Sequence, residues 1–411
     1  MMWNADLAWV LIAGGFVLIA LMLQRMLLNG LKPQKLVGDE SEYLRLANGK
    51  RDNTLWVRVP LGAAPLWFFR RWPIARQTTA GRAVISFVSS VTVGLTTWFA
   101  FRAGGPAAAL TAGTLALLCV ERGVLAIHLW SDIGLGLWLL LLSEVMRNAS
   151  SLPDMAMIGG IVAVGVLTRI DFLAAWGVAI LFAVFQDTAL WPTICFVAGP
   201  TVIAVAGLTL LHGMRHGVWA PDTSLLFNIS VAVTEARHPE MTTQDLMHTT
   251  VARRRQGQSV FVPSDSKSEV WLGPALYLLL RRLVVLLGPE TFVRHNLLNK
   301  RLAGYRPFHL SLKHGGTGAN LSFWFSAVFL AFLLLSSQIP LEISLLVMAV
   351  VMTQAAVQTR SRYRMSLLPV LATNVAIAVW SGGISAFSWS GLALGMACVA
   401  LQVCIRPRSE T

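Results

Sequence analysis

The sequence predicts an all-α fold, a polytopic bundle of transmembrane helices. Of its 411 residues, 55% are hydrophobic and only 13% are charged, whereas a soluble domain carries roughly 25% charged residues. The apolar run 7–28, interrupted only by Gln24 and Arg25, can cross roughly 30 Å of hydrocarbon at 1.5 Å per residue. Its start has no basic segment, so we expect a membrane span rather than a cleaved signal peptide.

Further apolar runs predict the other spans, about eleven in all. They lie near 83–101, 106–127, 131–146, 155–168, 172–186, 191–211, 321–337, 341–357, 366–381 and 388–405. We treat 1–411 as a single membrane domain, with a first polar loop at 29–82, a large polar loop at 212–319 and C-terminal spans in 320–411.

One apolar piece of the large loop, 270–288, has Arg281 and Arg282 at its centre. Each arginine would cost roughly 2.5 to 3.5 kcal/mol at the middle of a bilayer. We therefore predict an external amphipathic helix that lies at the membrane interface.

The predicted loops gather on one side of the membrane. With a cytoplasmic N-terminus, eleven alternating spans place segments 29–82, 120–132, 169–171, 212–319 and 358–365 on the non-cytoplasmic side. Much of the net charge of +13 is then external, contrary to the positive-inside bias, which is weak for long loops. The inverted topology would obey the bias and stays open. Clustered Arg and Lys on one face would suit an anionic lipid head group.

The segment GDESEYLRLANG at 38–49 is the first candidate for chemistry. Its spacing predicts a short amphipathic helix on the membrane surface, closed by Asn48 and Gly49 as a C-cap. Asp39 or Glu40, just outside the hydrocarbon, could then act as a general base on an acceptor hydroxyl. The alternative is a helix start, with Asp39 as N-cap and acidic residues favouring the helix dipole.

Two further polar pairs interrupt apolar sequence. His128 and Asp132 are spaced i and i+4, which would place them on one helix face and offers a weak metal-binding candidate; a structural histidine is the alternative. Arg169 and Asp171 interrupt about thirty apolar residues, where ionisable groups are rare and usually mark a site. A tight turn whose charges reach the interface is the other interpretation.

Basic residues follow in two segments. Arg58 precedes a Pro-bounded apolar stretch, and the segment 358–372 carries Arg360, Arg362 and Arg364 with Tyr363 between the last two. The planar guanidinium of arginine suits bidentate contacts with phosphate. A basic loop that only sets topology would explain the charge but not the aromatic residue and the proline that follow.

Taken in order, these elements resemble the GT-C superfamily of multi-spanning glycosyltransferases, which use polyprenyl-phosphate-linked sugars. The resemblance covers the whole order of elements, but each motif is short, and we expect no counterpart of the soluble C-terminal domain that the family often carries. The matching residues are Asp39-Glu40, Tyr43, Leu46-Ala47, the Arg-Val-Pro-Leu element at 58–61, Asp132, Arg362-Tyr363-Arg364 and Pro369.

The resemblance implies an inverting transfer of a sugar, from a polyprenyl-phosphate carrier to an acceptor hydroxyl, at the non-cytoplasmic face. It implies Asp39 as the base, with Glu40 and Asp132 as further acidic candidates. The implied carrier-phosphate site consists of Arg58, Arg169, Arg362, Tyr363 and Arg364. No cofactor is assigned; a divalent cation (Mg²⁺ or Mn²⁺) stays open, with His128 and Asp132 as weak ligand candidates.

The expected partners are the lipid-linked donor, membrane lipids and an acceptor (glycan, lipid or protein) that the sequence does not identify. We expect no nucleic acid as a partner. The expected location is the bacterial cytoplasmic membrane with the site facing the periplasm, or the lumenal face of the endoplasmic reticulum in a eukaryote. A transporter or flippase of an anionic lipid-linked substrate is the main rival, although it should show repeated broken helices. A membrane O-acyltransferase would need His128 or His212 as its base.

Overall fold

The structure is a computed structural model, and every element it describes is a helix. The described residues are 2–29, 36, 40–49, 59–129, 131–186, 190–223, 228–229, 233, 252–253, 256, 272–287, 324–357 and 361–382. Asp39, Arg58 and the predicted span 388–405 lie outside these ranges.

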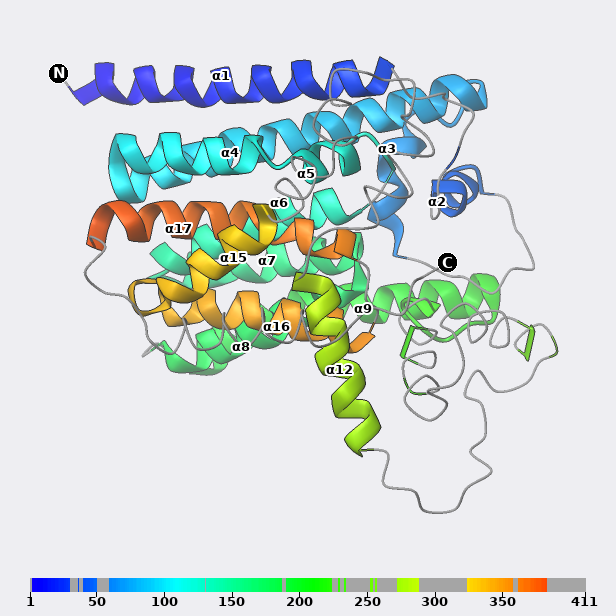
Figure 1. Cartoon of the computed structure of the whole chain (residues 1–411). Coiled ribbons are helices and arrows are strands. Elements are labelled where there is room, and N and C mark those ends of the chain that lie inside the picture. The colour runs from blue at the N-terminus through cyan, green and yellow to red at the C-terminus, as the bar shows by residue number, and fades with distance from the viewer. Residues whose placement is uncertain are drawn as a thin grey trace.

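Two long helices form one side of the bundle (Figure 1). α1 (Met2–Asn29) packs along α4 (Ile74–Leu117), which is interrupted at Gly105 (φ 76°, ψ −167°). A Cβ at Gly113 would lie 2.5 Å from Thr97 Oγ1, although sixteen residues of continuous helix would separate them by roughly 24 Å. The chain therefore reverses at Gly105, and α4 is a helical hairpin. Its first half contains the predicted run 83–101, and its second half ends at Leu117, ten residues before the end of the predicted run 106–127.

Seven more helices complete the bundle. They are α6 (Asp132–Asn148), α7 (Leu152–Thr168), α8 (Leu173–Phe185), α9 (Leu190–His216), α15 (Trp324–Leu334), α16 (Leu341–Val357) and α17 (Leu368–Gly382). α17 packs against α4 and α6, α7 against α6 and α9, and α8 against α9 and α16. A single large cluster of buried apolar side chains joins these helices.

Short elements gather at one end of the bundle, where α2 and α3 lie beside the start of α4 (Figure 1). α2 (Glu40–Ala47) ends as predicted, since Gly49 has a φ of 63° and its N–H bonds to Leu46 O. The other short elements are η1 (Pro60–Ala63), α3 (Ala64–Trp67), α5 (Val120–Leu125), η2 (Ile170–Phe172) and η5 (Ser361–Ser366).

The predicted spans agree with the helices in outline. Every predicted run that falls within the described residues contains a helix. Within the described ranges, Leu7–Asn29, Ile74–Leu117 and Trp191–Met214 are long and apolar enough to cross a membrane, and several shorter apolar helices accompany them. The chain is therefore an integral membrane protein, and the number and direction of its spans stay predictions.

One predicted loop is shorter than expected. The first polar loop was predicted to reach residue 82, but α4 begins at Ile74, directly after Pro73. Proline restricts its own φ and disfavours helix at the residue before it, so it suits a helix start. Arg82 thereby becomes a helical, buried residue rather than a loop residue.

The helix predicted in the large loop is present as α12 (Leu272–Leu287), which packs against α16 and η5, and its place at the membrane interface stays a prediction. Arg282 is buried, and its Nη1 donates to the carbonyls of Ala355 (3.4 Å) and Ala356 (2.9 Å). These carbonyls belong to the last turn of α16, which has no intrahelical donors for them. Arg282 therefore has a structural role, as a side-chain cap on a neighbouring helix.

The packing of α7 on α9 gives a matched test. A Cβ at Gly159 would overlap the carbonyl oxygen of Phe196, whereas a Cβ at Gly160 would meet nothing within 4 Å. We expect Gly159→Ala to lower the free energy of unfolding by about 1 to 3 kcal/mol, and Gly160→Ala to leave it unchanged or slightly raised. Thermal unfolding in detergent measures both, and equal effects would contradict this packing.

Candidate functional site

A fully buried ion pair holds the start of α2 against α4. Arg82 Nε donates to Glu40 Oε1 (3.0 Å), and Arg82 Nη2 donates to Glu40 Oε2 (2.8 Å). The side chains are 2% and 0% exposed. Burial alone would raise the pKa of Glu40, but the hydrogen bond and charge of Arg82, the nearby His128 and the Leu129 N–H together lower it. Glu40 therefore stays ionised and is a structural carboxylate in this arrangement.

The same helix binds the segment between α5 and α6. Leu129 N donates to Glu40 Oε1 (2.9 Å), and the hydroxyls of Tyr43 and Ser131 are 2.9 Å apart. Ser131 directly precedes Asp132, the first residue of α6. Glu40 and Tyr43 of α2 thus hold the segment that directly precedes Asp132.

Asp132 belongs to a cluster of three charges. Arg169 Nη1 forms an ion pair with Asp132 Oδ1, while Arg169 Nε and Nη2 donate to the two oxygens of Asp171 (2.9 and 2.8 Å). Asp171 lies in η2, the tight turn between α7 and α8. The tight turn that the sequence offered as one interpretation is present, and the guanidinium of Arg169 is shared between two carboxylates, while a functional role of this cluster stays a prediction.

His128 and Asp132 do not share a helix face, so that prediction is wrong. α5 ends at Leu125 and α6 begins at Asp132, because Leu129 N–H bonds to Glu40 instead of continuing a helix. The ring Nδ1 of His128 contacts Val124 O (2.9 Å). Within the part of the chain that the structure describes, no group of three or more His, Cys, Asp or Glu side chains forms a metal-binding cluster.

The basic C-terminal motif also reaches this end of the bundle. η5 packs against α5 and α6, and Met365 Sδ lies 3.7 Å from Cys119 Sγ. Arg364 is fully buried, donates from Nη1 to Leu286 O (3.1 Å), and lies 5.0 Å from the ring centroid of Phe325. The side chains of Arg362 and Tyr363 lie outside the described part of the structure.

Arg122, which the sequence analysis did not single out, is a buried cation in α5. It is 2% exposed, and its Nη1 donates to Ser89 O (3.3 Å). Its Nε and Nη2 have no hydrogen-bond partner among the described residues. Burial lowers its pKa to about 10, and the neighbouring Cys119 opposes part of that effect. Arg122 still carries a positive charge at neutral pH, without a carboxylate partner in the described ranges.

A further contact joins the first loop to the segment after α9. Val59 N donates to Asp222 Oδ2 (3.1 Å), and Asp222 is buried. Val59 directly follows Arg58, which lies outside the described residues. The sequence offered no signal for Asp222, because it reads as one more acid at the start of a long polar loop.

The structure thus brings together Glu40, Asp132, Arg169 and η5, and it adds Arg82, Arg122 and Asp222, which sequence reasoning missed. Each missed residue is recognisable by burial, which the sequence does not encode locally. In the sequence, the buried Arg82 and Arg122 cannot be distinguished from exposed arginines.

The Glu40–Arg82 pair gives a stability prediction. Glu40→Gln or Arg82→Met alone should lower the free energy of unfolding by roughly 3 to 5 kcal/mol, because each leaves a buried charge without its partner. The double variant should recover part of this loss. Unfolding in detergent measures the three variants, and losses that simply add would show that the two side chains act independently.

The same pair gives a pH dependence. The pKa of Glu40 is lower in the folded state than in the unfolded state. The stabilisation that ionised Glu40 gives to the fold is therefore fully present above the pKa of an unfolded glutamate. That contribution is lost as the pH falls through the folded pKa. The stability difference between wild type and Glu40→Gln should therefore shrink as the pH is lowered below the unfolded pKa of 4.5, and a difference that stays constant from neutral pH to well below 4.5 would contradict it.

No protein-family model and no curated protein matches this chain. Two similar solved structures are both of ArnT from Cupriavidus metallidurans. The form bound to undecaprenyl phosphate is 17% identical over 97% of this chain and 64% of its own, with a TM-score of 0.49. The apo form is 17% identical over 92% of this chain and 78% of its own, with a TM-score of 0.40. This chain spans 64% of the length of the first.

Proposed function

We propose that this protein is a GT-C-type glycosyltransferase that moves a sugar from a polyprenyl-phosphate carrier to an acceptor hydroxyl at one membrane face. One observation carries the proposal. Segments that lie far apart in the sequence meet at one end of a membrane-spanning bundle: α2 with its acidic start, the Asp132–Arg169–Asp171 cluster, and η5. The start of α2, Asp132 and the Arg-Tyr-Arg motif in η5 are among the residues on which the resemblance rests, and a base together with buried cations is what this transfer needs.

Asp39 is the better candidate for the base. Both oxygens of Glu40 accept hydrogen bonds from Arg82, and one also accepts from Leu129. A carboxylate that is so bonded, and 0% exposed, is poorly placed to take a proton from an acceptor. Asp39 is the preceding residue in the chain, so the ion pair of Glu40 anchors the backbone on which the proposed base is carried.

Arg122 and Arg364 are the better candidates for the carrier phosphate. Arg169 already forms ion pairs with two carboxylates, which neutralise its positive charge, so it would attract a third anion only weakly. Arg122 is buried, charged and has two donor nitrogens without partners in the described ranges. A buried cation without a counter-ion costs several kcal/mol unless a ligand supplies the anion. The contact of Cys119 with Met365 links α5, which carries Arg122, to η5, which carries Arg364.

In the proposed reaction, the acceptor oxygen attacks the anomeric carbon and loses its proton to Asp39. The bond between that carbon and the phosphate oxygen breaks, and its electron pair leaves with the polyprenyl phosphate. The direct displacement inverts the anomeric centre. The guanidinium groups stabilise the charge on the departing phosphate, and Arg169 positions Asp132 and Asp171 beside the site.

Transfer activity tests the base. Asp39→Asn should lower transfer from a polyprenyl-phosphate-linked sugar by roughly 10²- to 10⁴-fold, the usual contribution of a general base. Glu42→Gln removes a carboxylate from the same segment and should keep most of the activity. Full activity in Asp39→Asn would exclude Asp39 as the base, and a wild-type protein that moves the lipid-linked sugar between leaflets without transferring it would favour the flippase.

The role of Arg122 is tested by stability with and without the carrier. Arg122→Met should leave thermal stability unchanged or raised in the apo protein, because it removes a buried charge without a partner. It should also abolish the stabilisation that undecaprenyl phosphate gives to the wild type. Arg25→Met, at an exposed position on α1, is the control. A loss of apo stability as large as that of Arg82→Met would mark Arg122 as structural.

A further inference from the structure

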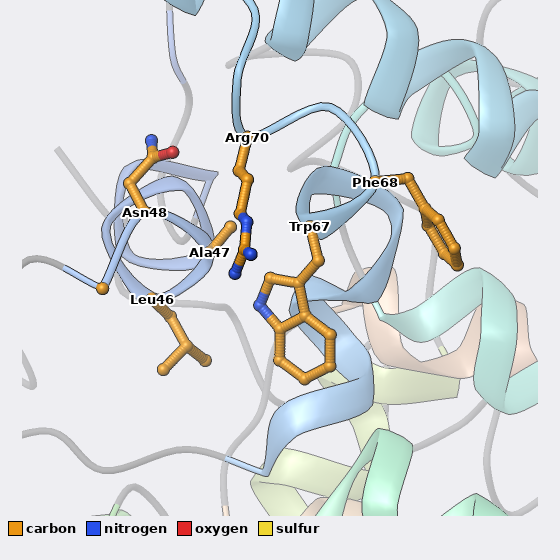
Figure 2. A pocket seen from close by; sticks show the side chains of 7 residues that line it. Leu46, Ala47, Asn48, Trp67, Phe68 and Arg70 are labelled. Atoms are coloured by element: carbon orange, nitrogen blue, oxygen red, sulfur yellow. The ribbon is translucent and has the colours of Figure 1, made fainter.

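A groove of about 640 Å³ lies between the C-terminal end of α2 and the end of α3, within the usual range of ligand sites. Its lining consists of Leu46, Ala47, Asn48, Gly49, Trp67, Phe68 and Arg70. In Figure 2 the side chains of Trp67 and Arg70 point toward the α2 ribbon, while Phe68 points away from it. The groove thus combines an aromatic wall with one cationic side chain.

Hydrogen bonds join the segments on the two sides of the groove. Gln77 and Asn48 exchange two amide hydrogen bonds of 3.2 Å each, and Gln77 also donates to Leu66 O (3.1 Å). These contacts join the end of α2 to the first turn of α4 and to α3. The relative placement of Trp67, Arg70 and α2 is therefore fixed by the fold before any ligand binds.

The rim of the groove is strongly basic. Arg70, Arg71 and Arg76 are all exposed. Within the described ranges, none of the three forms an ion pair. Three exposed cations within seven residues create a local positive potential that attracts anions.

Apolar side chains are exposed next to these arginines. Phe68 is 85% exposed, Trp72 50% and Ile74 56%. They lie immediately before, or at the start of, α4, a helix that is long and apolar enough to cross a membrane. Aromatic residues beside arginines at the start of a span are typical of the membrane interface, where head groups meet acyl chains.

We propose that this groove binds the head group of an anionic glycerophospholipid. Arg70 contacts the lipid phosphate inside the groove, and Arg71 and Arg76 add attraction from the rim. Trp67 lies at the level of the head group, while Phe68 and Trp72 contact the acyl chains. α2 is eight residues long, so the groove lies roughly 10 Å along this helix from Glu40.

Native mass spectrometry of the detergent-solubilised full chain tests this site. Dioleoyl-phosphatidylglycerol should bind more tightly than dioleoyl-phosphatidylcholine. Each rim or groove arginine should account for about fivefold in affinity, so Arg70→Gln/Arg71→Gln/Arg76→Gln should weaken phosphatidylglycerol binding by roughly 100-fold. Added salt should weaken wild-type binding more than binding by this triple variant.

Arg102→Gln is the matched control, because Arg102 is an exposed arginine near the other end of the first half of α4. It should leave phosphatidylglycerol binding unchanged. Equal binding of the two lipids, or an equal loss in Arg102→Gln, would overturn the proposal. So would an equal loss of undecaprenyl-phosphate binding in the triple variant, since the groove would then be the carrier site. The measurement needs no transfer activity, so its failure would leave the proposed transferase function untouched.

Discussion

The buried ion pair between Glu40 and Arg82 is the interaction on which the arrangement of the candidate site depends. It fastens α2, which has only eight residues, to a long membrane helix, because a helix this short is not stable alone in water. Glu40 Oε1 also accepts the N–H of Leu129, and this bond lies in the break between α5 and α6. One carboxylate thus sets the positions of two polar segments that are about ninety residues apart in the sequence.

The cations of this face fall into three physical classes. Arg82 and Arg169 are neutralised by carboxylates, so they hold segments together and contribute little to binding an anion. Arg282 caps the end of α16 by donating to its carbonyls. Arg122 is buried with incomplete hydrogen bonding, which is costly in a stable protein and expected where a ligand completes the interactions. The number of basic residues in the predicted loops therefore does not show which arginines are available to bind an anion.

Much of the bundle could be predicted from the sequence, because a run of apolar residues of sufficient length forms a helix in lipid whatever its neighbours are. The break at Gly105 falls in the gap between the predicted runs 83–101 and 106–127, and the predicted C-cap at Asn48 and Gly49 depends on local backbone preferences. The break between His128 and Asp132 was not predictable. Its cause is a hydrogen bond from Leu129 to Glu40, a residue 89 positions earlier in the chain.

The sequence by itself determined that this is an integral membrane protein and where most of its described helices lie, and it carries the ordered acidic and basic motifs on which the resemblance to GT-C enzymes rests. Only the tertiary structure decided what each charge does: Glu40 is a structural anchor, Arg169 is shared by two aspartates, and Arg122 is a buried cation. The physical reason is that the effect of a charge depends on its burial and its partners, and both are set by contacts between segments far apart in the chain.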